Sequence, residues 1–400
     1  MLRISSYTFM YYTEARNSYS GITIMIDQVA DAFKREDYRT AAALLKQWVK
    51  QEPKNPLVRL YVGRLHEATG KLEAAQTVYR QLLQGTTNPK IMSQARQGLG
   101  RVEATEKEQR QQARALANAD PNSGELGLFV LEPINPEVKQ VAAQKFARIM
   151  QIDAYTARLQ LPTRGWRLYR TGPMGDLQFY VSSLRGASIP CFAVPLAKIQ
   201  SLNVFRVNYF SDSDSDSRTP QCAAVCQNAE GQLGSLSFSW AEVAQRVEGL
   251  VPLFDEVVSW DANRQLQRKT QILDYVPFCD LHLPQRNSIL RLCDRNYQFQ
   301  QGIVLSPSPN TPHSLQPSLP NQTTTRKNWT NLLAFLNRHL PQTPVWSDFT
   351  SFAETALDYR EMLGHVASHI DLFRREETPW DPAFQLYSGL VFFKDAPQSN

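Results

Sequence analysis

Two stretches 34 residues apart decide the fold: AAALLKQWV at residues 41–49 and AQTVYRQLL at residues 75–83. In each stretch apolar residues recur every three or four positions, which is the spacing of one buried face of a helix. Every apolar position of the first face has an apolar counterpart in the second: Ala41, Leu44, Leu45, Trp48 and Val49 align with Ala75, Val78, Tyr79, Leu82 and Leu83. The chain therefore repeats a helical segment with a period of 34 residues.

A further helix precedes each stretch, so the repeating unit is a helix-turn-helix. Thr69-Gly70 supplies the turn within the second unit, and Pro53 and Pro56 separate the two units. A helix-turn-helix of this period resembles the tetratricopeptide repeat. The resemblance covers about residues 25–88.

The residues within the repeat support the resemblance. Ala41 and Ala75 stand where that family has a small residue for close helix packing, and Leu45 and Tyr79 occupy its bulky position on the second helix. The resemblance implies a superhelix whose first helices line a groove that docks a protein partner. In this chain the groove residues would be those of the first helix of the second unit: Leu57, Arg59, Leu60, Arg64 and Glu67.

The charge of the repeat region indicates the chemistry of a partner. Residues 25–118 hold sixteen Lys and Arg against ten Asp and Glu, which favours an acidic or amphipathic partner. The lysine and asparagine clamp with which some family members hold a chaperone's terminal carboxylate is absent, so a cochaperone role is disfavoured.

Changes in composition divide the chain into six segments. We expect a disordered leader at 1–24, tetratricopeptide-like helices at 25–118, a small α+β module at 128–210, a mainly antiparallel β region at 211–305, a Pro/Ser-rich linker at 306–325, and helices with a strand at 326–400. The fold class is thus multidomain, with an all-α helical repeat followed by an α+β region that has an antiparallel sheet and C-terminal helices.

Several elements are predicted from local patterns. We expect two helices within 90–118, a helix near 241–251, and a hairpin joining 290–292 to 297–299. A capping box at 351–354 predicts a helix whose apolar stripe continues to Ile370. The apolar run FQLYSGLVFF at 384–393 is predicted to be a strand.

Motifs typical of catalysis or metal binding are scarce in the sequence. The sequence has no G-x-S-x-G, H-E-x-x-H, P-loop or G-x-G-x-x-G motif, so we expect neither catalysis nor a cofactor. Glu361, His365 and His369 are spaced by four residues and would share a helix face, as zinc ligands can. That face lies beside the apolar stripe, where polar residues are expected on any amphipathic helix. We therefore favour the interpretation that these three side chains are solvent-exposed, and we expect no metal site.

An arginine cluster is the second candidate site. Arg158, Arg164, Arg167 and Arg170 fall within thirteen residues, and guanidinium groups suit phosphate or carboxylate recognition. On a regular strand Arg167 and Arg170 would point to opposite faces. Pairing with local acidic residues is therefore favoured over a single anion site.

Overall composition limits the functional classes. A net charge of +5 over 400 residues is a mild bias, which disfavours nucleic-acid binding. No window approaches 18 consecutive apolar residues, so no membrane span is expected. Five cysteines, an odd number, argue for a reducing compartment, and we expect a cytoplasmic protein.

These observations favour a non-enzymatic protein-interaction scaffold or assembly factor. Two alternatives stay open: a nucleic-acid or anionic-lipid binder that uses the basic repeats and the arginine cluster, and an enzyme whose repeats recruit substrate. On the runs RGWRLYRTG and WSDFTSFAETALDY, the C-terminal region is similar to uncharacterised tetratricopeptide proteins of cyanobacteria, a likeness that implies no activity.

Overall fold

The computed structural model describes residues 25–212, 221–260, 266–305, 324–374 and 376–394. The expected leader at 1–24 and all but the end of the expected linker at 306–325 lie outside these residues. The chain divides into two compact units, one ending at Ala115 and one beginning at Leu116, and each is described by itself.

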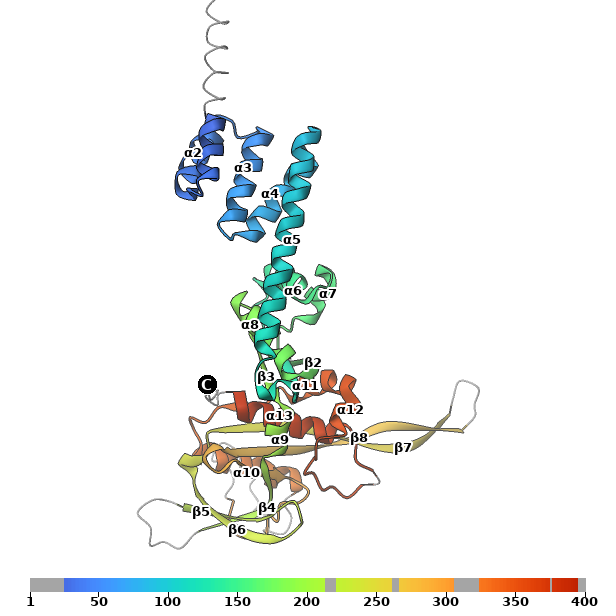
Figure 1. Ribbon diagram of the computed structural model, residues 1–400. Coiled ribbons are helices and arrows are strands. Elements are labelled where there is room, and N and C mark those ends of the chain that lie inside the picture. The colour runs from blue at the N-terminus through green and yellow to red at the C-terminus, as the bar shows by residue number, and fades with distance from the viewer. Residues whose placement is uncertain (1–24, 213–220, 261–265, 306–323, 375, 395–400) are drawn as a thin grey trace, which may run out of the picture. The chain divides into compact units, whose positions relative to one another are not determined.

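The N-terminal unit is built from helices joined by short turns (Figure 1). After a helical segment at 25–34 come α2 (Tyr38–Gln51), α3 (Pro56–Ala68), α4 (Leu72–Gly85) and α5 (Pro89–Ala117). Asp37 caps α2 by accepting from the Thr40 backbone N–H, and Asn55 caps α3 in the same way through Leu57. The apolar faces that repeat in the sequence supply the cores between these helices.

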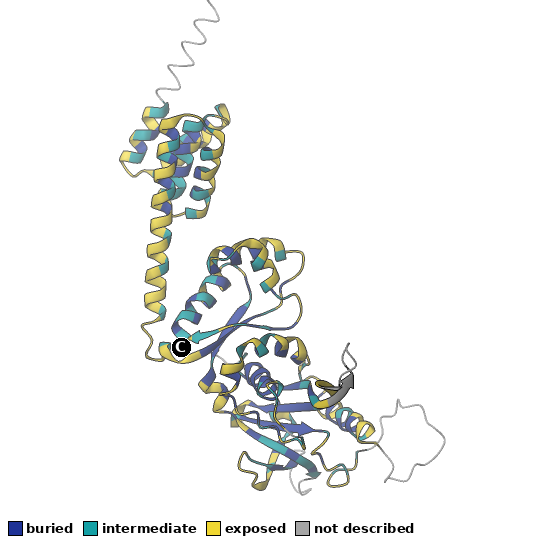
Figure 2. Cartoon of the chain, turned by 90° about the vertical axis from the view of Figure 1, so that its right-hand side faces the viewer, coloured by how far each residue is buried: buried dark blue, intermediate teal, exposed yellow. Residues whose placement is uncertain are grey.

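The prediction of two helices within 90–118 is wrong, because α5 runs through the region without a break. The sequence from Val102 to Lys107 holds no helix breaker and is made mostly of good helix formers. The buried residues of α5 all lie in its first half, the last being Val102. Figure 2 shows the second half as largely exposed.

Close packing around one tyrosine sets the spacing between helices α3, α4 and α5. The Tyr79 ring of α4 is fully buried between Gly63 of α3 and Gly98 of α5. A Cβ atom at Gly63 would lie 2.6 Å from the ring, and one at Gly98 would lie 2.5 Å from it. Only glycine lets three helices approach one aromatic ring at this distance.

The second unit begins with a small antiparallel sheet in the order β2-β1-β3. Its strands are β1 (Leu126–Leu131), β2 (Arg167–Pro173) and β3 (Cys191–Pro195), and the short turn η1 (Pro121–Gly124) precedes them. Helices α6 (Lys139–Met150), α7 (Ala154–Gln160) and α8 (Met174–Gly186) cover one face. Side chains alternate along β1, so that Phe129 faces these helices and Leu128 faces the rest of the unit.

The larger sheet has seven strands in the order β10-β7-β8-β9-β4-β5-β6. Its elements are α9 (Leu196–Gln200), β4 (Asn203–Asp212), β5 (Gln221–Gln227), β6 (Leu233–Ser239), η2 (Trp240–Glu242), β7 (Gln245–Trp260), β8 (Leu266–Leu283), η3 (Pro284–Arg286), β9 (Ser288–Cys293) and β10 (Val345–Trp346). The β4–β9 and β7–β10 pairs are parallel, and the other pairs are antiparallel. Because β4 belongs to this sheet, the expected boundary at residue 210 falls inside a strand of the larger sheet.

Two local predictions in this sheet are wrong. The helix expected near 241–251 does not form, because η2 ends at Glu242 and from Gln245 onward the chain is strand β7, paired with β8. The expected hairpin at 290–299 does not form, because both edges of β9 are already paired, with β8 and with β4. The Cys293 carbonyl does accept from the Tyr297 N–H in a tight turn, but no return strand follows.

The C-terminal elements pack on both sheets. They are α10 (Thr325–His339), α11 (Phe349–Ala356), η5 (Leu357–Tyr359), α12 (Arg360–Leu363) and α13 (Trp380–Lys394). The helix expected from the capping box begins at Phe349 instead, and it ends well before Ile370 because the chain breaks at η5 and again at Gly364.

The strand predicted at 384–393 is also wrong, because these residues form α13. The helix is buried on nearly all sides, so its sequence is apolar without the periodicity of a surface helix. It joins the core shared by the two sheets.

The predicted fold class is confirmed: repeat-like helices precede a region with two sheets and C-terminal helices. In the described part of the chain, no helix combines the length and the apolar character needed to cross a membrane.

The Tyr79 packing yields a stability prediction with an internal control. Gly98→Ala places a methyl group against the Tyr79 ring and should cost about 1–3 kcal/mol. Gly100→Ala, two residues further along the same helix, meets nothing within 4 Å and should stabilise by about 0.5–1 kcal/mol. Urea unfolding of the full chain, followed by circular dichroism, measures both. Equal effects of the two substitutions would contradict the packing argument.

Candidate binding surface and pocket

Helix α3 presents the predicted partner-binding residues on different faces. At about 100° per residue, Leu57, Tyr61 and Arg64 share one face of the helix, and all three are partly exposed. The Arg64 guanidinium lies over the Tyr61 ring, 5.4 Å from its centroid. Arg59 is exposed on the opposite side of α3, so it does not extend this face.

Leu60 and Glu67 hold the fold instead of facing a partner, and Leu57 and Tyr61 each pack one side against the cores between the helices. Leu60 is buried in the core between α3, α4 and α5. Glu67 accepts a hydrogen bond from the Tyr79 hydroxyl at 2.7 Å and two from the Arg101 guanidinium at 2.6 and 3.0 Å. Burial, with this hydrogen bond, raises the pKa of Tyr79 above its ordinary value. Sequence reasoning missed Tyr61, whose place beside Arg64 follows from their helical spacing.

Comparison with known proteins bears on this surface directly. A family model described as Tetratricopeptide repeat matches residues 32–91. These residues are therefore similar to tetratricopeptide repeats. The match covers α2, α3 and α4, so the partly exposed face of α3 lies within the part of the chain that resembles the repeat family.

Neither a curated protein nor a solved structure matches the chain. The likeness of the C-terminal region to cyanobacterial proteins therefore stays a prediction.

The arginine cluster is arranged differently from the prediction. The β1–β2 register shifts at Tyr169, so Arg167 pairs with Leu131 and Arg170 pairs with Phe129. This bulge places both arginines on the face that carries α6–α8, where a regular strand would have separated them. Both line a pocket of about 450 Å³ whose wall also includes Asp358. Arg158 and Arg164 are exposed and do not line it.

The candidate metal ligands do not share a helix face. Helix α12 ends at Leu363, before His365 and His369, and His369 has a left-handed backbone with φ of 51°. Among the residues that the structure describes, no three His, Cys, Asp or Glu side chains gather closely enough to hold a metal ion.

A buried polar cluster joins the larger sheet to α13. The Ser388 hydroxyl donates to Asp280 Oδ2 at 2.6 Å and lies 2.9 Å from His282 Nε2. Since a hydroxyl has one proton, His282 Nε2–H is the donor in the second contact. A serine nucleophile needs the reverse, a hydroxyl that gives its proton to histidine. The three side chains are also fully buried, so this geometry fits a structural network.

The same network contains a buried ion pair. The Arg291 guanidinium donates to both carboxylate oxygens of Asp280, at 2.9 and 2.7 Å, and to Gln385 Oε1 at 2.9 Å. It also donates to the Ser368 carbonyl at 2.6 Å. These contacts satisfy the hydrogen-bond donors of a charged side chain that is 98% removed from solvent. A buried charge is tolerated only when it is paired in this way.

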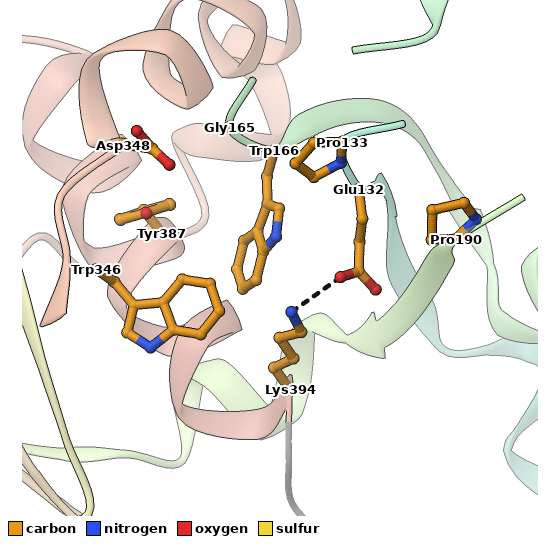
Figure 3. Close-up of a pocket in the computed structure, with 9 residues that line it drawn as sticks. All are labelled: Glu132, Pro133, Gly165, Trp166, Pro190, Trp346, Asp348, Tyr387 and Lys394. Carbon is orange, nitrogen blue, oxygen red and sulfur yellow. Dashed lines mark ion pairs between the residues drawn. The ribbon is translucent and has the colours of Figure 1, made fainter. Parts of the chain in front are cut away.

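A pocket of about 290 Å³ lies where the small sheet meets β10 and α13. Figure 3 shows its wall, which consists of Glu132, Pro133, Gly165, Trp166, Pro190, Trp346, Asp348, Tyr387 and Lys394. The Trp166 and Trp346 rings are tilted by 47°, with centroids 5.0 Å apart. Lys394 Nζ lies over both rings and 2.8 Å from a Glu132 carboxylate oxygen. No motif could have indicated this pocket, because its residues come from distant parts of the chain.

The buried histidine predicts a pH dependence of stability. Burial lowers the pKa of His282 from 6.5 to about 4, so the unfolded chain takes up a proton there before the folded chain does. This histidine's contribution is complete above pH 6.5 and is lost as the pH falls toward 4, with a slope of up to about 1.4 kcal/mol per pH unit. His282→Gln should flatten the decline of unfolding free energy between pH 7 and 5, measured by urea titration.

His369 adds to the same decline, because burial lowers its pKa to about 4 as well. His369→Gln should therefore flatten the curve in the same direction as His282→Gln. A His282→Gln protein with the wild-type pH profile would show that His282 is not kept neutral by burial.

Proposed function

We propose that this chain is a non-enzymatic protein-interaction scaffold that docks a protein partner on its tetratricopeptide repeats. The observation that carries the proposal is the match of the repeat family to residues 32–91, since such repeats act as docking platforms. An assembly-factor role is a narrower form of the same proposal. We also propose a cytoplasmic location, which is supported by five cysteines that are all free.

The face of α3 formed by Leu57, Tyr61 and Arg64 is the docking surface that we propose. Tyrosine and arginine dominate the residues that carry binding energy in protein interfaces. Here the Tyr61 ring already holds the Arg64 guanidinium, which reduces the side-chain entropy lost on binding. Within the described residues Arg64 has no ion-pair partner, so its charge is available to an acidic group.

The anion-binding alternative has one observation in its favour, the shared pocket of Arg167 and Arg170. Asp358 lines the same pocket and offsets part of their charge. Under the scaffold proposal, Arg167→Ala combined with Arg170→Ala leaves the salt concentration of elution from heparin unchanged. A large shift to lower salt in the double variant would favour binding of nucleic acid or anionic lipid.

A charge reversal on α3 tests the docking surface. Arg64→Glu should lower the affinity for an acidic partner by roughly tenfold or more, because a repulsive charge replaces an attractive one. Arg59→Glu is the matched control, since it makes the same change on the opposite side of the same helix. Quantitative affinity capture with the full chain identifies partners, and titration of each recovered partner gives the affinities.

Circular dichroism establishes that both variants are folded before they are compared. Equal binding by wild type and Arg64→Glu would exclude this face of α3. Equal losses in both variants would indicate that overall charge, and not this face, attracts the partner.

A further inference from the structure

The pocket beside α13 has the geometry of a cation cage. Lys394 Nζ lies 5.1 Å from the centroid of the Trp166 ring and 4.8 Å from that of Trp346. An ammonium group over an aromatic face is attracted by the negative centre of the ring, and the attraction grows when water is excluded. Trp166 is only 4% exposed and the Lys394 side chain only 23% exposed, so much of the water around this contact is displaced.

The charge of the wall also favours a cation. Glu132 pairs with Lys394 at 2.8 Å, and Asp348 contributes a second carboxylate to the same wall. Among the described residues that line the pocket, Lys394 is the one basic side chain against two carboxylates, so this part of the wall carries more negative than positive charge. Figure 3 shows the two indoles and Tyr387 around the space into which the lysine reaches.

We propose that this pocket is a recognition site for alkylammonium groups, and that Lys394 is a resident occupant that an incoming ammonium group displaces. The ligand class is a lysine-type side chain, methylated or not, or a small quaternary amine; the two sources share the same cationic head. The indoles supply the faces for its methyl or methylene groups, and Glu132 supplies the counter-charge.

The position of Lys394 allows the exchange. It is the last residue of α13, directly after the core residues that anchor the helix. Its flexible stem can rotate out toward solvent without moving the helix. The pocket has a volume of about 290 Å³ besides the lysine, which exceeds what a single water molecule needs.

Removal of the Lys394 side chain, followed by titration with a small ammonium ion, tests the proposal directly. Tetramethylammonium chloride is titrated into the full chain by calorimetry, with sodium chloride at equal ionic strength as the reference. Lys394→Ala should bind the probe roughly tenfold or more tightly than wild type, because the competing occupant is gone. Lys198→Ala, which removes an exposed lysine elsewhere in the same unit, should behave as wild type.

Two further variants separate the cage from a general charge effect. In the Lys394→Ala background, Trp346→Leu should abolish the gain and Glu132→Gln should reduce it. Sodium acetate should show no tighter binding to Lys394→Ala than to wild type, whereas a preference for acetate in wild type would assign the pocket to an anion. Should Lys394→Ala fail to fold, Lys394→Gln gives the same comparison, since it keeps a long side chain and removes the charge.

The two ligand sources are distinguished by comparing choline with a short peptide that carries trimethyllysine. Tighter binding of the peptide assigns the pocket to a partner's lysine, and tighter binding of choline assigns it to a small amine. A folded Lys394→Ala or Lys394→Gln protein that binds tetramethylammonium no more tightly than wild type would overturn the proposal.

Discussion

The buried ion pair of Arg291 and Asp280 determines where helix α13 lies. A charged guanidinium in a protein core is tolerated only when its donors are satisfied, and removing one partner typically costs about 3–5 kcal/mol. Here the partners come from β8, from the segment after α12 and from α13. Helix α13 therefore has one position on the larger sheet in which Gln385 and Ser388 meet this network. That position also carries Tyr387 and Lys394 to the pocket wall.

The sequence was most informative where local pattern and tertiary structure agree. The repeat helices were predictable because each has an exposed face, so its apolar residues keep a helical period. Helix α13 has no such face, and its continuous apolar run has the composition of a buried strand. The helix predicted near 241–251 was wrong for a related reason. From Gln245 onward, pairing with β8 overrides the weak helical preference of these residues.

The binding surfaces were predictable only in part, because their geometry depends on contacts that the sequence does not contain. Arg64 could be placed on the correct helix, but Leu60 and Glu67 turned inward through packing with α4 and α5. The arginines of β2 share a face because of a bulge at Tyr169, and no residue type at that position signals a bulge. The pocket around Lys394 joins five separate segments of the chain, and only the fold brings them together.

The cage combines a wall held in the core with an occupant on a long, flexible side chain, which suits it to exchange. Trp166 contacts Phe192 and Tyr387 in the core between the sheets, so its ring cannot turn away when the ammonium leaves. Lys394 lies one residue beyond that core, and the rotation of a side chain at such a position is fast compared with any opening of the fold. An empty cage would expose two indole faces next to an unpaired carboxylate, which is unfavourable. The resident lysine therefore stabilises the free protein and sets the affinity that an external cation has to exceed.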